Sequence, residues 1–335
     1  MKPRVAILLG DPAGIGPELV AKLLASRDLA RSAHVAVIGD RSVLADGQRI
    51  AGTRASLATI DDIGELPNQT GVRFLHLSAA EVGPITHGRV SAEGGRSALI
   101  TARFALEHAR GGKLDGIMFA PFNKEALRLA GSPYPSELAL FAHELGVTTP
   151  YGEHNVLSHL WTSRVSSHVS LADVPSLITR ARVLETIRFL HASLRNYGIK
   201  TPRIAVSALN PHASDGGLFG TEEKTQIAPA IADAVGEGIA AFGPFPADTI
   251  FLRVKTERYD GVVSMYHDQG QIATKLLGFH RGVTVCGGLP IPITTPAHGT
   301  AMDIAGKGVA NPGATKEAFR LLTRLAAGNL KASAK

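Results

Sequence analysis

The chain has a single cysteine, Cys286, among its 335 residues. One cysteine excludes an internal disulfide framework and a zinc site built from several thiolates of one chain. Long hydrophobic runs are also missing, because none approaches the roughly 20 apolar residues that a membrane helix needs. The apolar run at residues 5–9 is too short for the core of a secretory signal. We therefore expect a cytoplasmic protein that does not cross a membrane.

Aromatic side chains are scarce, at 5% of the residues with one Trp and five Tyr. The 35 Lys and Arg residues are scattered, and they form no basic tract despite a net charge of +6. A nucleic-acid module would present clustered cations or stacking aromatics, so the composition argues against that class of partner. A modest positive balance instead favours small acidic substrates.

Apolar runs of strand length alternate with helical patterns along the chain, which predicts an α/β fold with parallel sheets. The length of 335 residues is enough for two domains. Polar side chains follow several predicted strands directly, among them Asp11, Asn123, His212 and His267. Ligands of open α/β sheets bind beyond the carboxyl ends of the strands, so we expect these segments to meet at one cleft. The predicted strands are 5–9, 35–38, 116–119, 155–157, 168–171, 203–208 and 261–265, and the predicted helices are 17–24, 98–110, 175–196, 225–242 and 316–326.

The segment 298–312 has the sequence HGTAMDIAGKGVANP, which combines three glycines after His298 with Asp303 and Asn311. Its composition alone is also typical of an ordinary turn. The string resembles the adenosine-binding loop of the metal-dependent decarboxylating dehydrogenases of the isopropylmalate and isocitrate type. This resemblance implies NAD as cofactor and a hydroxy acid as substrate, and a carboxylate at position 303 would repel the 2′-phosphate of NADP. The residues it assigns to the cofactor are His298, Gly299, Ala301, Asp303 and Asn311.

Longer motifs point to a narrower family. The strings GDPAGIGPE at 10–18, LNPHASDGGLFG at 209–220, PADT at 246–249, MYHDQG at 265–270 and GFHRGV at 278–283 resemble the 4-hydroxythreonine-4-phosphate dehydrogenases. The match extends over essentially the whole chain. It implies two α/β/α domains with a cleft between them, as in isopropylmalate and isocitrate dehydrogenases. We expect residues 1–130 with 300–335 to form one domain and residues 131–299 the other.

Each histidine in these motifs could by itself be an ordinary hydrogen-bonded loop residue. The family resemblance assigns His168, His212 and His267 to a divalent metal. Three imidazoles favour zinc, while magnesium, manganese and cobalt stay open. In the family this site lies at a dimer interface, so we expect a homodimer whose second domain carries the histidines and the interface.

The resemblance gives two further residues an open role. Lys275 occupies the position of a substrate-contacting lysine in the family, although its residue type fits an ordinary surface lysine equally well. Asp248 is either an acid–base group or a helix cap. We carry both forward as the catalytic candidates.

The chain departs from the family where the substrate phosphate is expected. The string SELA at 136–139 replaces a Gly-His-Thr-Glu motif, and Ile293 and Thr284 replace an Arg and an Asn. A phosphate dianion favours a bidentate guanidinium, so these changes predict a weakened phosphate site with Glu137 and Ile293 in its wall. Arg281 or Lys124 could compensate.

The altered pocket, together with shared short motifs, resembles the decarboxylating cis-dihydrodiol dehydrogenases of terephthalate breakdown. The sequence therefore predicts an NAD- and metal-dependent enzyme that oxidises terephthalate dihydrodiol to protocatechuate, CO2 and NADH. The alternative is 4-hydroxythreonine-4-phosphate dehydrogenase activity in pyridoxal phosphate synthesis, or oxidation of a related phosphorylated hydroxy acid.

Overall fold

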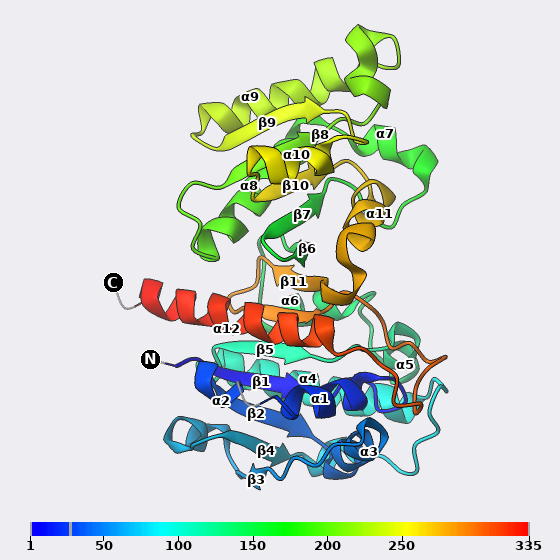
Figure 1. Cartoon of the computed structure of the whole chain (residues 1–335), viewed down its shortest axis with the longest axis vertical. Coiled ribbons are helices and arrows are strands. Elements are labelled where there is room, and N and C mark those ends of the chain that lie inside the picture. Colours follow the sequence, from blue (N-terminus) through cyan, green and yellow to red (C-terminus); the bar gives the residue numbers. More distant parts are fainter. Residues whose placement is uncertain (1, 27–28, 334–335) are drawn as a thin grey trace. The chain divides into compact units, whose positions relative to one another are not determined.

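The computed structural model describes residues 2–26 and 29–333. The chain divides into two compact units, of which unit 1 comprises residues 1–152 and 283–335 and unit 2 comprises residues 153–282 (Figure 1). The second domain was expected from the sequence to extend from residue 131 to residue 299. The segments 131–152 and 283–299 instead belong to unit 1. Both units consist of a sheet flanked by helices, which confirms the predicted α/β class.

The sheet of unit 1 has the strand order β3-β4-β2-β1-β5-β12-β11. Every pairing is parallel except that between β11 and β12. The central strands are uninterrupted apolar runs because helices cover both faces of the sheet. The strands are β1 (Arg4–Leu8), β2 (His34–Gly39), β3 (Ala58–Thr59), β4 (Val72–His76), β5 (Gly116–Phe119), β11 (Val283–Gly287) and β12 (Ile293–Pro296).

Side chains alternate between the two faces of this sheet. Ala6 and Leu8 of β1 join the core beneath α4, α5 and α6. Thr294 of β12 instead donates to the carbonyl of Ala318 on α12, at the opposite face. Helices α1 and α3 pack together, and α1 also contacts α12 (Figure 1). The helical segments are α1 (Gly16–Leu24), α2 (Leu29–Ser32), α3 (Arg41–Ala51), η1 (Ile63–Asn68), η2 (Ser78–Ala80), α4 (Ala92–Arg110), α5 (Lys124–Leu129), α6 (Glu137–Glu144) and α12 (Gly313–Ser333).

The sheet of unit 2 has the order β6-β7-β10-β8-β9, with an antiparallel pair β6–β7 and parallel pairings elsewhere. Helices α8 and α9 pack on it, and α10 contributes Ile250 and Val254 to a core with Tyr259. The strands are β6 (Gly152–Leu157), β7 (Leu160–Arg164), β8 (Arg203–Ser207), β9 (Ala240–Phe245) and β10 (Gly261–Ser264). The helical segments are η3 (Leu171–Asp173), α7 (Val174–Leu177), α8 (Arg180–Asn196), η4 (Pro211–Gly217), η5 (Glu223–Ile227), α9 (Ala228–Gly236), α10 (Ile250–Glu257), α11 (His267–Gly278) and η6 (Phe279–Arg281).

One predicted strand was wrong, and two predicted helices were wrong in part. The strand expected at 168–171 is a loop in which His168 has a left-handed φ of 53°. The helix expected over 175–196 breaks at Ile178, and Thr179 then caps α8 by accepting from the backbone of Arg182. The helix expected over 225–242 ends at Gly236, and its last residues belong to β9. No helix within residues 2–26 and 29–333 is long and apolar enough to cross a membrane.

Candidate active site

Three neighbouring parallel strands of unit 2 lead to the three predicted metal ligands. Strands β7, β10 and β8 are adjacent, and they end at Arg164, Ser264 and Ser207. His168, His267 and His212 follow these ends within five residues. Because parallel strands end at the same edge of a sheet, the topology brings the three segments to one edge of unit 2.

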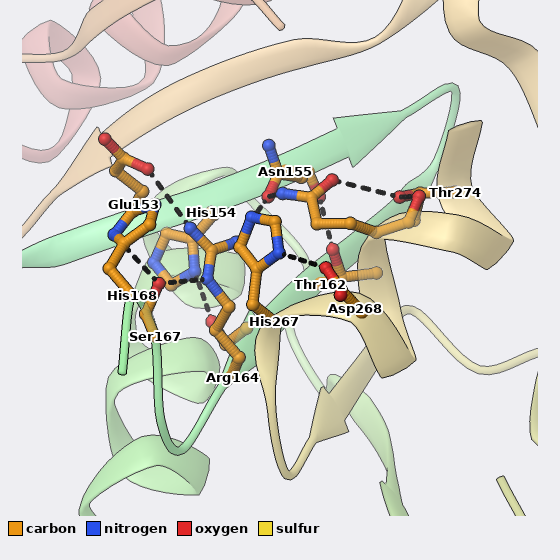
Figure 2. A network of polar contacts seen from close by, with 12 residues as sticks. Glu153, His154, Asn155, Thr162, Arg164, Ser167, His168, His267, Asp268 and Thr274 are labelled. Atoms are coloured by element: carbon orange, nitrogen blue, oxygen red, sulfur yellow. Dashed lines mark hydrogen bonds and ion pairs between the residues drawn. The ribbon is translucent and has the colours of Figure 1, made fainter. Parts of the chain in front are cut away.

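The structure places His168 and His267 side by side, with ring centroids 5.4 Å apart (Figure 2). Two imidazoles that share one tetrahedral zinc at Zn–N distances of about 2.0–2.1 Å have centroids about 5 Å apart. His267 Nδ1 lies 2.7 Å from Asp268 Oδ1, a contact that leaves Nε2 for a metal. The pair therefore fits two of the imidazoles of a divalent metal site.

His212 stands apart from this pair. Within the described residues, no group of three or more His, Cys, Asp or Glu side chains could hold a metal ion. His212 begins a left-handed turn in which Ala213, Ser214 and Asp215 also have positive φ, and its ring lies 6.3 Å from that of Phe219. One copy of the chain thus supplies two of the three expected ligands as a pair and presents the third separately.

A carboxylate clamp fixes the base of the left-handed turn. Glu223 Oε1 accepts hydrogen bonds from the backbone N–H groups of Leu209 and Asn210, at 2.9 and 2.7 Å. The side-chain amide of Asn210 donates to Glu223 Oε2 and to Glu222 Oε2, at 2.9 and 2.8 Å. The hydrogen bonds around Glu222 also hold the pKa of its carboxyl below the ordinary value. The entry to the His212 turn is therefore held rigidly.

Arg164, at the end of β7, belongs to the polar network around the histidine pair (Figure 2). Its guanidinium donates to Ser167 Oγ, Asn155 Oδ1 and Glu153 Oε2, at 2.9, 2.7 and 3.2 Å. Burial lowers the pKa of Arg164, while the charge of Glu153 opposes that shift. Ser167 Oγ in turn lies 3.3 Å from His168 Nδ1.

In unit 1 the nucleotide-type loop is anchored on helix α1. Glu18 Oε1 accepts from the backbone N–H of Ala310 at 2.8 Å and from Lys22 Nζ at 2.6 Å. Lys22 also donates to the carbonyls of Gly308 and Ala310. The imidazole of His298 is half-buried, and desolvation lowers its pKa and favours the neutral ring. The cofactor candidates His298, Gly299, Ala301, Asp303 and Asn311 are thus all on one anchored loop.

Two of these candidates differ in what they can offer. Asp303 is exposed, so its carboxylate is accessible to a ligand. Asn311 Oδ1 accepts from the backbone N–H of Gly313 at 2.8 Å, at the start of α12. The side-chain NH2 group of Asn311 is then the part that can bind a base edge. Asn311 would therefore act on the base as a hydrogen-bond donor.

A cavity of about 480 Å³ lies in unit 1 beside this loop. Residues 82–86 and 89–94 line it together with Pro12 and Ala13. The segment between these stretches lies against the loop, since a Cβ on Gly306 would meet the ring of His87 at 3.1 Å and a Cβ on Gly88 would meet the carbonyl oxygen of Met302 at 2.7 Å. Sequence reasoning missed residues 82–94, because they match no motif and lie in a segment with few regular elements. The volume is within the range of small-molecule sites.

The remaining predicted site residues are dispersed. Lys275, Asp248 and Arg281 are exposed in unit 2, whereas Glu137 and Thr284 are half-buried in unit 1. Ile293 is fully buried in the hydrophobic core of unit 1, alongside Ile117 and Cys286. Its packing is that of a core residue, so Ile293 gives no support to an apolar substrate wall.

Comparison with known proteins identifies the family of this chain. The model of the pyridoxal phosphate biosynthetic protein PdxA matches residues 31–322. The chain belongs to the PdxA family. It is 51% identical over 96% of its length and 97% of the relative to a Pseudomonas aeruginosa protein provisionally named 4-hydroxythreonine-4-phosphate dehydrogenase 2. A Bradyrhizobium diazoefficiens protein provisionally named D-threonate 4-phosphate dehydrogenase is 41% identical over 97% of both chains.

Solved structures agree with this assignment. The 4-hydroxythreonine-4-phosphate dehydrogenase of Klebsiella pneumoniae superposes with a TM-score of 0.84 at 37% identity, covering 97% of this chain and 98% of the other. A β-decarboxylating dehydrogenase of Thermococcus kodakarensis, at 19% identity and a TM-score of 0.50 over 99% and 86% of the two chains, shares the fold. The predicted fold class is thereby confirmed.

The expectation of a terephthalate dihydrodiol dehydrogenase was wrong. The terephthalate 1,2-cis-dihydrodiol dehydrogenase of Burkholderia xenovorans is only 27% identical, with a TM-score of 0.65 over 96% and 98% of the two chains. The alternative activity has relatives at 37–51% identity over nearly the whole chain. The physical error lay in Ile293, whose replacement of an Arg was taken as a change of the pocket although the side chain is in the core. The decarboxylating step and the role in aromatic breakdown lose their support with it.

Proposed function

We propose that this chain is an NAD- and metal-dependent dehydrogenase that oxidises a phosphorylated hydroxy acid of the 4-hydroxythreonine 4-phosphate or D-threonate 4-phosphate type. The observation that carries this proposal is the whole-length similarity to dehydrogenases named for those substrates, at 51% and 41% identity. The paired imidazoles and the anchored loop supply independent support from the structure.

The metal would be held by His168 and His267 of one copy, with His212 of a second copy as the third ligand. This division follows from the 5.4 Å ring separation of the first two and from the lack of a third donor near them within the described residues. Each histidine segment also exposes large apolar side chains, which a second copy would cover. These side chains are Val169 and Leu171, Leu218 and Phe219, and Ile272 and Leu276. We therefore propose a homodimer joined through unit 2.

NAD would bind along the loop at 298–311, with its ribose hydroxyls on Asp303. The anchoring of the loop by Glu18 and Lys22 keeps the backbone N–H groups of the loop in place before a ligand arrives. The adjoining cavity of about 480 Å³ has room for part of the cofactor. The low pKa of His298 keeps this side of the site free of an additional positive charge.

The reaction removes a hydride from the carbinol carbon and a proton from its hydroxyl, giving a ketone, NADH and one proton. A bound divalent ion would lower the pKa of that hydroxyl. Lys275 and Asp248 are our candidates for the group that takes the proton, and both are exposed. Lys275 is eight residues beyond His267 on α11, about 12 Å along the axis, so it would contact the substrate and not the metal. Either Arg281 or Lys124 is the cation we propose for the phosphate, and both are exposed.

Formation of NADH by the metal-loaded protein tests this function. We expect turnover of 4-hydroxythreonine 4-phosphate or D-threonate 4-phosphate, and none of terephthalate dihydrodiol. His267→Ala should abolish turnover, while His159→Ala should leave it unchanged because His159 is exposed at the β6–β7 turn. Turnover of the dihydrodiol alone, or equal turnover in both variants, would contradict the proposal.

A further inference from the structure

We infer that Arg164 is a positioning residue that fixes the separation of His168 and His267 for metal binding, an inference that rests on the proposed function. The guanidinium of Arg164 holds one intermediary on each side, Ser167 toward His168 and Asn155 toward α11. The network is drawn in Figure 2.

The first link sets the His168 side. Arg164 Nε donates to Ser167 Oγ at 2.9 Å, and Ser167 Oγ lies 3.3 Å from His168 Nδ1. The serine oxygen has two lone pairs, so it can accept from the guanidinium and from the Nδ1–H of His168 together. That arrangement selects the tautomer with its proton on Nδ1, which leaves the lone pair that a metal needs on Nε2. It also supports a residue with a φ of 53°, a conformation that costs energy for any side chain with a Cβ.

The second link sets the His267 side. Asn155 Oδ1 accepts from Arg164 at 2.7 Å and from the side-chain amide of Gln271 at 2.7 Å. Gln271 lies four residues after His267 on α11, one helical turn along the same face. Thr274 contacts Gln271 in turn, at 3.4 Å. The rotation of the helix that begins at His267 is therefore tied to the same guanidinium that holds Ser167.

The position suits arginine and no other cation. Three acceptors surround the side chain, and a guanidinium reaches all three with fixed geometry, whereas an ammonium would have to move to reach each one. The carboxylate of Glu153, at 3.2 Å, compensates the charge of a side chain that is only 9% exposed. Nothing in the proposed chemistry consumes this charge, so its function lies in the geometry it imposes.

Metal affinity separates this role from a general contribution to folding. Zinc binding is measured by competition with a chromophoric chelator, the geometry by the visible absorption of bound Co²⁺, and folding by thermal unfolding without metal. We expect Arg164→Lys and Arg164→Gln to weaken zinc binding by about 10–100-fold and to alter the Co²⁺ spectrum. Ser167→Ala removes only one hydroxyl, and we expect it to weaken binding by about tenfold. Arg180→Gln breaks an exposed ion pair with Asp233 in the same unit, and it should change neither the zinc affinity nor the Co²⁺ spectrum.

The outcomes are distinguishable. Wild-type affinity and an unchanged Co²⁺ spectrum in folded Arg164→Gln overturn the role of Arg164 and leave the proposed function standing. If that variant does not fold, Ser167→Ala decides, because an unchanged affinity there breaks the first link. A wild-type chain that takes up neither Zn²⁺ nor Co²⁺ overturns the metal site itself, and this inference with it.

Discussion

The buried imidazole of His154 should make unit 2 sensitive to mild acid. His154 has no exposed surface, and its ring stacks on Phe189 at 4.4 Å. Its nitrogens contact the hydroxyls of Ser163 and Ser193 at 2.5 and 2.8 Å. Desolvation, helped by the charge of Arg164, lowers the pKa of His154 to about 3, against an ordinary value of 6.5. The folded protein therefore keeps the neutral ring at a pH where the unfolded chain takes up a proton.

The sign and size of the effect follow from that difference. Because the folded-state pKa is lowered, the unfolded state binds more protons between pH 6.5 and pH 3, so stability falls as the pH falls through this window. Each pH unit within it costs about 1.4 kcal/mol. Between pH 7 and pH 5 the loss amounts to about 2 kcal/mol from this one residue. Above pH 7 His154 should contribute no further pH dependence.

Urea unfolding at pH 7 and pH 5 measures this loss, with the fluorescence of Trp161 as the signal. Trp161 is the one tryptophan of the chain, and its ring lies 5.5 Å from that of His154. His154→Gln lowers stability at both pH values because the stacking is lost, but it should remove about 2 kcal/mol of the pH-dependent difference. His159→Gln deletes an exposed imidazole of the same unit and should leave that difference unchanged. An equal pH dependence in wild type and His154→Gln would refute the reasoning.

Three further results are expected. Gly95→Ala places a Cβ 2.0 Å from the carbonyl oxygen of Ala126 and should lower the free energy of unfolding in denaturant by about 1–3 kcal/mol. As a control, the Cβ of Gly236→Ala meets nothing within 4 Å and should raise that free energy by roughly 0.4–1 kcal/mol. Equal effects of the two variants would contradict the packing of α4 on α5. Removal of the metal by a chelator should abolish NADH formation and added Zn²⁺ or Co²⁺ should restore it, while full activity of the metal-free protein would exclude a catalytic ion. Asp303→Asn should reduce the preference for NAD over NADP in kcat/KM about fivefold, because the repulsion between the carboxylate and the 2′-phosphate of NADP in water is about 1 kcal/mol. An unchanged ratio of the two kcat/KM values would show that Asp303 does not contact the ribose.

The central strands were predictable because burial on both faces leaves a plain signal. The runs at 5–9, 35–38 and 116–119 are β1, β2 and β5, the interior strands of unit 1, with shifts of a residue or two at the ends. Strands β4 and β9 were missed, since they are interrupted by polar or glycine residues and lie at or near the margins of their sheets. The tertiary environment stabilises such strands more than their own sequence does.

For the candidate site, the sequence predicts residues but not their conformation. The family resemblance assigns His168, His212 and His267 to the metal, and the strand order explains why their segments share an edge. The left-handed backbone at His168 and His212 has no local sequence signal, because neither position is a glycine. The error at Ile293 has a similar origin. A motif specifies which residue occupies a position, and packing decides which face of β12 the side chain joins.

The left-handed turn that presents His212 has an energetic consequence for the proposed dimer. Four residues with side chains, His212 to Asp215, adopt positive φ in succession, at roughly 1–2 kcal/mol each. Contacts within one copy offset part of this conformational energy, because Ser214 is buried and Glu223 accepts hydrogen bonds from the backbone at the start of the turn. The exposed Leu218 and Phe219 that follow offer further stabilisation only if another surface covers them. A strained segment of this kind persists when its surroundings over-determine it, so binding of a metal and a second copy at His212 should stabilise the turn as well as the assembly.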